Sequence, residues 1–132
     1  MTRVFVSYSR RDEESARRMS NALRSAGVDV WMDYEKVQLG ESWDKSIRKG
    51  VEESNYMIVL LTPDSTQSEW IANEVSLAKH FARPIVPVLM KGATTAAAPA
   101  GLRNLQMIDA NDNVEVAIRK LAADFSKHGS SR

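Results

Sequence analysis

The sequence predicts an α/β fold in which an open sheet of five parallel strands is covered by helices on both faces. Short apolar runs rich in β-branched residues alternate along the chain with segments whose apolar residues recur at helical spacing. The run at Tyr56–Leu61 is apolar throughout, which is typical of a central parallel strand buried on both faces. Strands that alternate with helices in this way are joined by crossovers and therefore lie parallel.

The first predicted strand is Val4–Tyr8, an apolar run with β-branched and aromatic side chains. A helix follows, because Asp12 is a suitable N-cap and apolar residues then recur at helical spacing. Gly27 stands where a glycine commonly ends a helix, and Val28–Met32 forms the second predicted strand.

The middle of the chain is predicted to hold two helices around the central strand. A polar stretch over residues 34–41 is expected to form a loop, and Ser42 is then expected to cap the second helix. The central strand Tyr56–Leu61 comes after that helix. A third helix is predicted over residues 67–81, with a serine or threonine near its start as the cap.

The last third of the chain predicts two weaker strands and one helix. Pro84–Leu89 is the fourth strand, and its prolines favour a position near the sheet edge. Residues 90–104 include an alanine-rich loop, and Leu105–Ile108 is a short fifth strand. Asp112 is expected to cap the final helix, and residues 126–132 are expected to form a frayed tail.

The composition is that of a globular domain, since 43% of the 132 residues are apolar and 27% are charged. The length suits one domain over residues 1–132, with an ordered core at 3–125. The net charge of +1 gives no reason to expect a nucleic-acid partner, and no apolar run is long enough for a membrane span. The chain has no cysteine, and His80 and His128 lack ligand-spaced partners for a metal. Because no secretory leader is visible, we expect a cytoplasmic protein.

Glu74 is the most informative residue of the predicted third helix. Trp70 precedes it by about one turn, so the indole and the carboxylate lie on one face of the helix. The spacing from Ile71 and to Ala78 places the carboxylate, half-buried, at the edge of the stripe that faces the interior. A charge there is costly unless it is paired or binds a ligand. An aromatic side chain beside a carboxylate can bind a ligand that consists of a flat ring joined to a sugar.

The carboxyl ends of parallel strands share one edge of the sheet, where ligands of open α/β sheets bind. Tyr8 ends the first predicted strand, and Arg10 and Asp33 follow predicted strands. These residues are therefore expected at this edge, together with the loops that carry Trp43 and Trp70. After its first strand the chain lacks the glycine-rich turn of a dinucleotide-binding domain and the acidic pair of a receiver domain. The sequence thus predicts a ligand site that belongs to neither class.

Several segments resemble, in order and spacing, those of Toll/interleukin-receptor (TIR) domains, and bacterial-type members in particular. These segments are Val4–Ser9 with Asp12, Gly27–Asp33, Gly40–Trp43, Ser68–Glu74 and Pro84–Val88. The likeness extends over residues 3–125. It implies a flavodoxin-like, three-layer α/β/α domain that associates with other TIR domains.

The resemblance also implies an activity, since one branch of the family cleaves NAD to nicotinamide and linear or cyclic ADP-ribose when its domains assemble, here in bacterial defence or signalling. NAD is then the substrate, and neither a cofactor nor a metal is implied. Glu74 matches the catalytic glutamate of that branch. The implied substrate-binding residues are Tyr8, Arg10, Asp33, Glu35, Trp43 and Trp70. Among them, Arg10 would meet a phosphate and Trp70 would stack on nicotinamide or shape the pocket.

Two alternatives stay open. In one of them, Glu74 is a surface carboxylate that pairs with Lys79 or with a neighbouring loop, and the tryptophans are packing residues. In the other, the whole domain is a non-catalytic module that docks on other TIR domains, and a bacterial form would be delivered into a host cell as an effector that interferes with TIR signalling. The sequence leaves the product, the activating trigger and the oligomer geometry undetermined.

Overall fold

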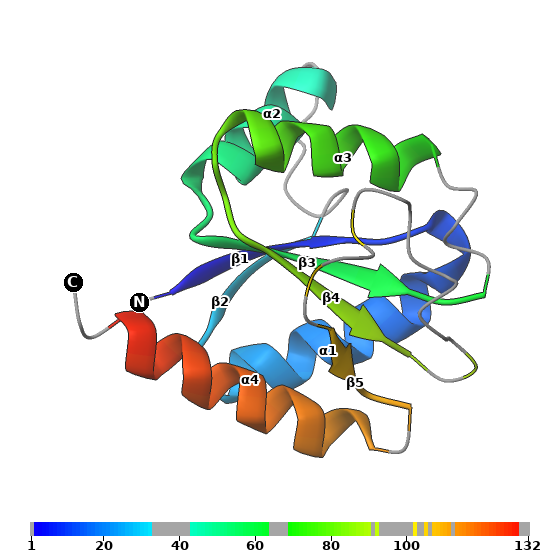
Figure 1. Cartoon of the computed structure of the whole chain (residues 1–132), viewed down its shortest axis with the longest axis vertical. Helices are drawn as coiled ribbons and strands as arrows, with labels where there is room; N and C mark the ends of the chain where they lie inside the picture. The colour runs from blue at the N-terminus through cyan, green and yellow to red at the C-terminus, as the bar shows by residue number, and fades with distance from the viewer. Residues whose placement is uncertain are drawn as a thin grey trace.

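The computed structural model contains one sheet of five parallel strands in the order β2-β1-β3-β4-β5 (Figure 1). The strands are β1 (Arg3–Ser7), β2 (Asp29–Met32), β3 (Tyr56–Leu61), β4 (Ile85–Leu89) and β5 (Ile108–Asp109). The helices are the short 3-10 helix η1 (Arg10–Asp12), α1 (Glu13–Ser25), α2 (Trp43–Glu53), α3 (Glu69–His80) and α4 (Val114–Gly129). The alternation of parallel strands and helices confirms the predicted fold class.

The structure describes residues 2–32, 43–63, 69–90, 92, 102, 105, 107–111 and 113–129, and of residues 43, 44, 69, 70 and 126–129 it describes the backbone alone. The predicted loop at 34–41 and the predicted cap Ser42 lie outside this part of the chain. Within it, no helix combines the length and the hydropathy that crossing a membrane requires.

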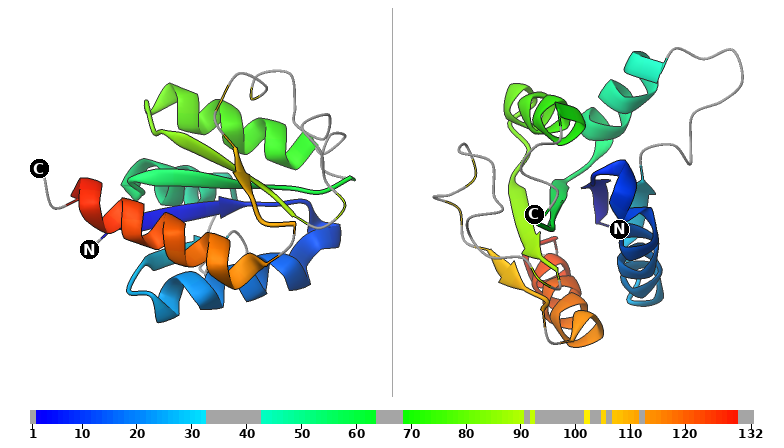
Figure 2. Two further views of the ribbon diagram at one scale, coloured as in Figure 1. Left: turned by 60° about the horizontal axis from the view of Figure 1, so that its bottom comes forward. Right: turned by 90° about the vertical axis from the view of Figure 1, so that its right-hand side faces the viewer.

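Two helical layers enclose the sheet: α1 and α4 cover one face, and α2 and α3 cover the other (Figures 1 and 2). Successive side chains of a strand point to opposite faces. Along β1, Val4 and Val6 accordingly pack under α1 and α4, whereas Phe5 packs under α2 and α3. β3 is the middle strand and is buried from residue 57 to 61, as predicted. Full burial of each large apolar side chain contributes about 1.5–3 kcal/mol, so the two cores hold the layers together.

The sheet ends with its weakest pair of strands. β4 is the penultimate strand, in agreement with its predicted position near an edge, and β5 pairs with it only at Val88 and Leu89. β5 is shorter and begins later than the predicted stretch Leu105–Ile108. The reason is a turn, in which the N–H of Leu105 donates to the carbonyl of Leu102 at 3.1 Å.

α1 ends as the sequence predicts, with Gly27 in the left-handed conformation at a φ of 88°. The N–H of Gly27 donates to the carbonyl of Arg24 at 3.0 Å, and the N–H of Val28 donates to the carbonyl of Leu23 at 3.0 Å. This pair of bonds is a Schellman motif, which satisfies carbonyl groups that the helix itself leaves unpaired.

α3 ends in the same motif, but with an alanine at the left-handed position. Ala82 has a φ of 55°, and its N–H donates to the carbonyl of Lys79 at 3.1 Å. The N–H of Arg83 donates to the carbonyl of Ala78 at 2.8 Å. Because no glycine marks this helix end, the local sequence did not predict the motif.

α4 begins and ends differently from the prediction. Asn113 acts as its cap, because the side-chain Oδ1 accepts a hydrogen bond from the N–H of Val116 at 3.1 Å. The predicted cap, Asp112, lies outside the described residues. The helix runs to Gly129, so the tail that was predicted to fray from residue 126 is helical for several residues more.

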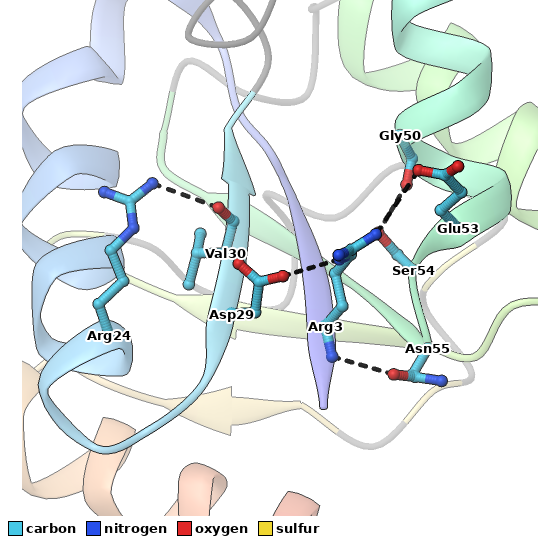
Figure 3. Close-up of polar contacts among 8 residues, drawn as sticks. All are labelled: Arg3, Arg24, Asp29, Val30, Gly50, Glu53, Ser54 and Asn55. Carbon is cyan, nitrogen blue, oxygen red and sulfur yellow. Dashed lines mark hydrogen bonds and ion pairs between the residues drawn. The ribbon is translucent and has the colours of Figure 1, made fainter. Parts of the chain in front are cut away.

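Polar contacts tie the amino ends of three strands together (Figure 3). The N–H of Arg3 donates to Oδ1 of Asn55 at 2.9 Å, and the N–H of Asn55 donates back to the carbonyl of Arg3 at 2.7 Å. The guanidinium of Arg3 pairs with Asp29 at 2.8 Å and with Glu53 at 3.5 Å. These contacts join β1 to β2 and to the start of β3, at the edge opposite to the predicted site.

We expect Ala82→Gly to stabilise the protein by about 1 kcal/mol, because glycine takes a positive φ without the strain that a Cβ causes. Gly27→Ala is the matched opposite change, and it should destabilise the protein by about the same amount. Urea unfolding followed by circular dichroism measures both differences. A loss of stability in Ala82→Gly would contradict this account of the α3 end.

Candidate active site

Glu74 lies within the buried stripe of α3, not at its edge. Ile71 and Ala78 are completely buried, Val75 is nearly so, and the Glu74 side chain among them is 1% exposed. The prediction of a half-buried carboxylate was therefore wrong in degree. The alternative of a surface carboxylate is excluded by this burial. Periodicity locates the stripe, but the depth of each side chain depends on the elements packed against the helix.

The carboxylate of Glu74 is held by a serine from the sheet. The hydroxyl of Ser7 donates to Oε1 of Glu74 at 2.6 Å, and the two residues are 67 positions apart in the chain. A length of 2.6 Å is within the range for O–H···O hydrogen bonds in proteins. Ser7 is not among the site residues predicted from the sequence. The sequence feature that could have identified it is a polar residue at the end of a buried strand, on the same strand face as Phe5.

The Ser7–Glu74 pair lies where the strand order reverses. From β1 the chain passes to β2 on one side, and β3, β4 and β5 then follow on the other side. In open α/β sheets, ligands bind outside the carboxyl ends of the strands at this switch point. Ser7 is the last residue of β1 and lies opposite Val59 of β3.

On the same face, α3 starts at the carboxyl edge, on the right of Figure 1, to which the β3 arrow points. α2 begins at Trp43, and Trp70 is the second residue of α3, one turn before Glu74. The backbone thus brings the Trp70 position to the face and edge that hold the carboxylate, and the Trp43 position to the same face. Their side chains lie outside what the structure describes.

Tyr8 does not share this face. It follows β1 directly and continues the strand alternation, so its side chain is buried in the core under α1 and α4. This placement does not favour the prediction that Tyr8 lines one pocket with Glu74. Arg10 lies exposed in η1 at the carboxyl edge. Asp33 and Glu35 lie outside the described residues.

Asp12 has a different partner from the one predicted. It precedes α1, but its side chain makes no hydrogen bond to the helix start. Instead, Oδ2 of Asp12 accepts a hydrogen bond from the hydroxyl of Thr62, just after β3, at 2.8 Å. This bond fixes η1, and with it the backbone of Arg10, beside the end of the central strand.

A separate pocket of about 490 Å³ opens at the carboxyl edge on the face of α1 and α4. Asp12, Thr62, Met90 and Asn111 are among the residues that line it, and Glu74 is not among them. Hydrogen bonds from the backbone and then the side chain of Asn111 lower the pKa of the neighbouring Asp109 below its usual range. The pocket and the Glu74 carboxylate thus lie on opposite faces of the sheet: the pocket is on the face of α1 and α4, and Glu74 is on the face of α2 and α3.

Comparison with known families identifies the chain. A family model described as TIR domain matches residues 4–122. This chain therefore belongs to the TIR domain family.

Two curated relatives carry named activities. The chain is 32% identical over 90 residues to the probable 2′ cyclic ADP-D-ribose synthase TcpO of Methanobrevibacter olleyae, a match that covers 65% of this chain and 26% of TcpO. It is 33% identical over 73 residues to the NAD(+) hydrolase TcpA of Theionarchaea archaeon (strain DG-70-1), which covers 54% of this chain and 22% of TcpA. The matched part is thus about a quarter of the length of these relatives.

Solved structures show the same fold. The TIR domain of the Toll-related receptor TRR-2 from Hydra magnipapillata superposes on this chain with a TM-score of 0.79. The two are 21% identical, and the superposition covers 93% of this chain and 97% of that domain.

We expect Thr62→Val to lower the free energy of unfolding by about 1–3 kcal/mol, because it removes a donor to a carboxylate while keeping the shape of the side chain. In an Asp12→Ala background the same substitution should cost much less, since the acceptor is already gone. Urea unfolding of the wild type, both single variants and the double variant measures the difference. Equal costs in the two backgrounds would show that the bond contributes nothing.

Proposed function

We propose that this TIR domain cleaves NAD at the bond between nicotinamide and ribose, with Glu74 as its catalytic residue. The observation that carries the proposal is the buried carboxylate of Glu74, held by Ser7 at the edge of the sheet where the strand order reverses. A buried carboxylate opposes folding, and such groups concentrate at functional sites. The named activities of TcpO and TcpA support NAD as the substrate.

The chemistry of NAD suits a single carboxylate. The nicotinamide ring is cationic in NAD and leaves as a neutral molecule with the electron pair of the broken C–N bond, so no strong general acid is needed. The positive charge that develops on the ribose is stabilised by a nearby carboxylate, most strongly where water is excluded. If water then adds to the ribose carbon and loses a proton, the product is ADP-ribose. If a hydroxyl group of the ADP-ribosyl cation itself adds to the ribose carbon and loses its proton, the product is cyclic.

In this proposal the substrate enters beside the starts of α2 and α3. Trp70, one turn before Glu74, stacks on nicotinamide or shapes the pocket, and Trp43 forms a wall. Arg10 binds a phosphate, since a guanidinium offers a forked pair of donors. The burial of Tyr8 on the opposite face supports assigning it to the core and not to the pocket. Asp33 and Glu35 stay as predicted contacts, and the reaction needs no metal or cofactor.

The second candidate function is a non-catalytic module that binds other TIR domains. A hydrogen bond between two completely buried side chains also serves folding, so the Ser7–Glu74 pair is compatible with that function. The two candidates differ in one measurable respect, which is whether the assembled domain releases nicotinamide from NAD.

We expect Glu74→Gln to reduce the rate of nicotinamide release by about 100- to 1000-fold, because it removes the charge and keeps the size of the side chain. The purified domain is mixed with NAD at high protein concentration, and nicotinamide is followed by liquid chromatography. Glu52→Gln is the matched control, since Glu52 is an exposed carboxylate on α2, and its rate should equal that of the wild type.

If the wild type and Glu74→Gln are equally inactive in every assembled state, the enzymatic proposal fails and the interaction module is favoured. If both release nicotinamide at the same rate, Glu74 is not the catalytic residue. Mass spectrometry of the second product distinguishes linear ADP-ribose from a cyclic isomer, which is lighter by one water.

We propose further that the domain is active when it associates with other TIR domains, as the family resemblance implies. The rate of nicotinamide release per molecule should then rise with protein concentration, in parallel with the oligomer fraction measured by light scattering. A rate per molecule that stays constant while the oligomer fraction rises would contradict this dependence.

A further inference from the structure

Ser7 stands out in β1 because it is polar and completely buried. The other residues of the strand from Val4 to Val6 are apolar, and all of them are 0% exposed, as Ser7 is. A buried hydroxyl without a hydrogen bond costs about 1–3 kcal/mol by mutational measurements, so a serine here requires a partner. Its described partner is Oε1 of Glu74, at 2.6 Å.

The two members of the pair differ in how firmly they are held. Ser7 lies in a strand that pairs with β2 on one side and β3 on the other. Its backbone is therefore held by the β3 ladder at Ser7 itself and by both ladders at the preceding residue, Val6. The glutamate side chain has several rotatable bonds, and its rotamer must be selected by contacts. A hydrogen bond to a fixed hydroxyl selects one orientation of the carboxylate.

The bond to Ser7 engages one of the two oxygens of the Glu74 carboxylate. A carboxylate has about four acceptor positions on two oxygens, and Ser7 occupies one position on Oε1. Ile71 and Val75, in the same stretch of α3, are buried as well. The bond to Ser7 on Oε1 thus limits the orientations that the whole carboxylate can take.

We propose that Ser7 is a positioning residue for the proposed reaction, in which its hydroxyl holds the Glu74 carboxylate where positive charge develops on the ribose. The inference rests on the proposed function of Glu74. Displacement of a reacting group by about 1 Å can reduce a rate about 100-fold, so the orientation of this carboxylate has a large effect on kcat. Ser7 itself need not touch the substrate.

The test compares Ser7→Ala with Ser7→Thr, because threonine restores the hydroxyl and alanine does not. We expect Ser7→Ala to lower kcat for nicotinamide release by about 10- to 100-fold with little change in KM. Ser7→Thr should recover much of that loss. All rates are measured well below the melting temperature of each variant, so that a difference in folded fraction does not enter.

A second comparison removes the carboxylate charge first. In a Glu74→Gln background, Ser7→Ala should have little further effect on the residual rate, since the group that it positions no longer acts. This double-variant comparison remains informative if the added methyl group of threonine disturbs the fold.

The outcomes are distinguishable. If the wild type releases nicotinamide and Ser7→Ala has the same kcat but a lower melting temperature, Ser7 serves folding alone and the inference is overturned. If Ser7→Ala lowers the rate equally with and without the Glu74 carboxylate, its effect does not pass through Glu74 and the inference is again overturned. If the wild type is inactive in every assembled state, the proposed function fails first, and the positioning role fails with it.

Discussion

The pairing of β1 with β2 on one side and β3 on the other is the constraint on which the site depends. A strand that is buried on both faces must send alternate side chains into different helical layers. Phe5 therefore packs toward α2 and α3, and Ser7 meets α3 on that same face. Tyr8 goes to the core under α1 and α4. Because adjacent side chains point to opposite faces, the hydroxyl of Ser7, and not that of Tyr8, meets the carboxylate of Glu74.

The polar groups at the amino ends of the strands have a different role from those at the carboxyl ends. At the amino edge, Arg3 satisfies its backbone and its charge with Asn55 and Asp29, which lie in other segments of the chain. At this edge the polar groups of Arg3 are thus paired with other groups of the same chain. At the carboxyl edge the helices start and the strand order reverses, which is the geometry that binds ligands in open α/β sheets. The Thr62–Asp12 bond holds η1 there. The fold therefore separates the edge that stabilises the sheet from the edge proposed to carry chemistry.

The buried carboxylate of Glu74 opposes stability. Transferring a charge from water to the interior costs several kcal/mol even after relaxation, and each hydrogen bond to the charged group returns about 1.5–3 kcal/mol. The apolar neighbours Ile71, Val75 and Ala78 show that an apolar side chain is compatible with this stripe. The proposed reaction, which places positive charge on a ribose, gives a reason for a carboxylate in this apolar stripe and connects its energetic cost to the proposed function.

The sequence by itself determined the local features: the apolar run of β3, the apolar stripe of α3, the glycine that ends α1 and the parallel order that follows from alternating elements. It also selected Glu74, because periodicity places that carboxylate among apolar residues. Only the tertiary structure decided that Ser7 is its partner, that Tyr8 faces the other core, and that Asp12 bonds to Thr62 instead of capping α1. These outcomes join residues that are distant in the chain or depend on which face of a strand meets which helix. The periodicity of one segment carries no information about contacts between different segments, because those contacts are set by the packing of the layers.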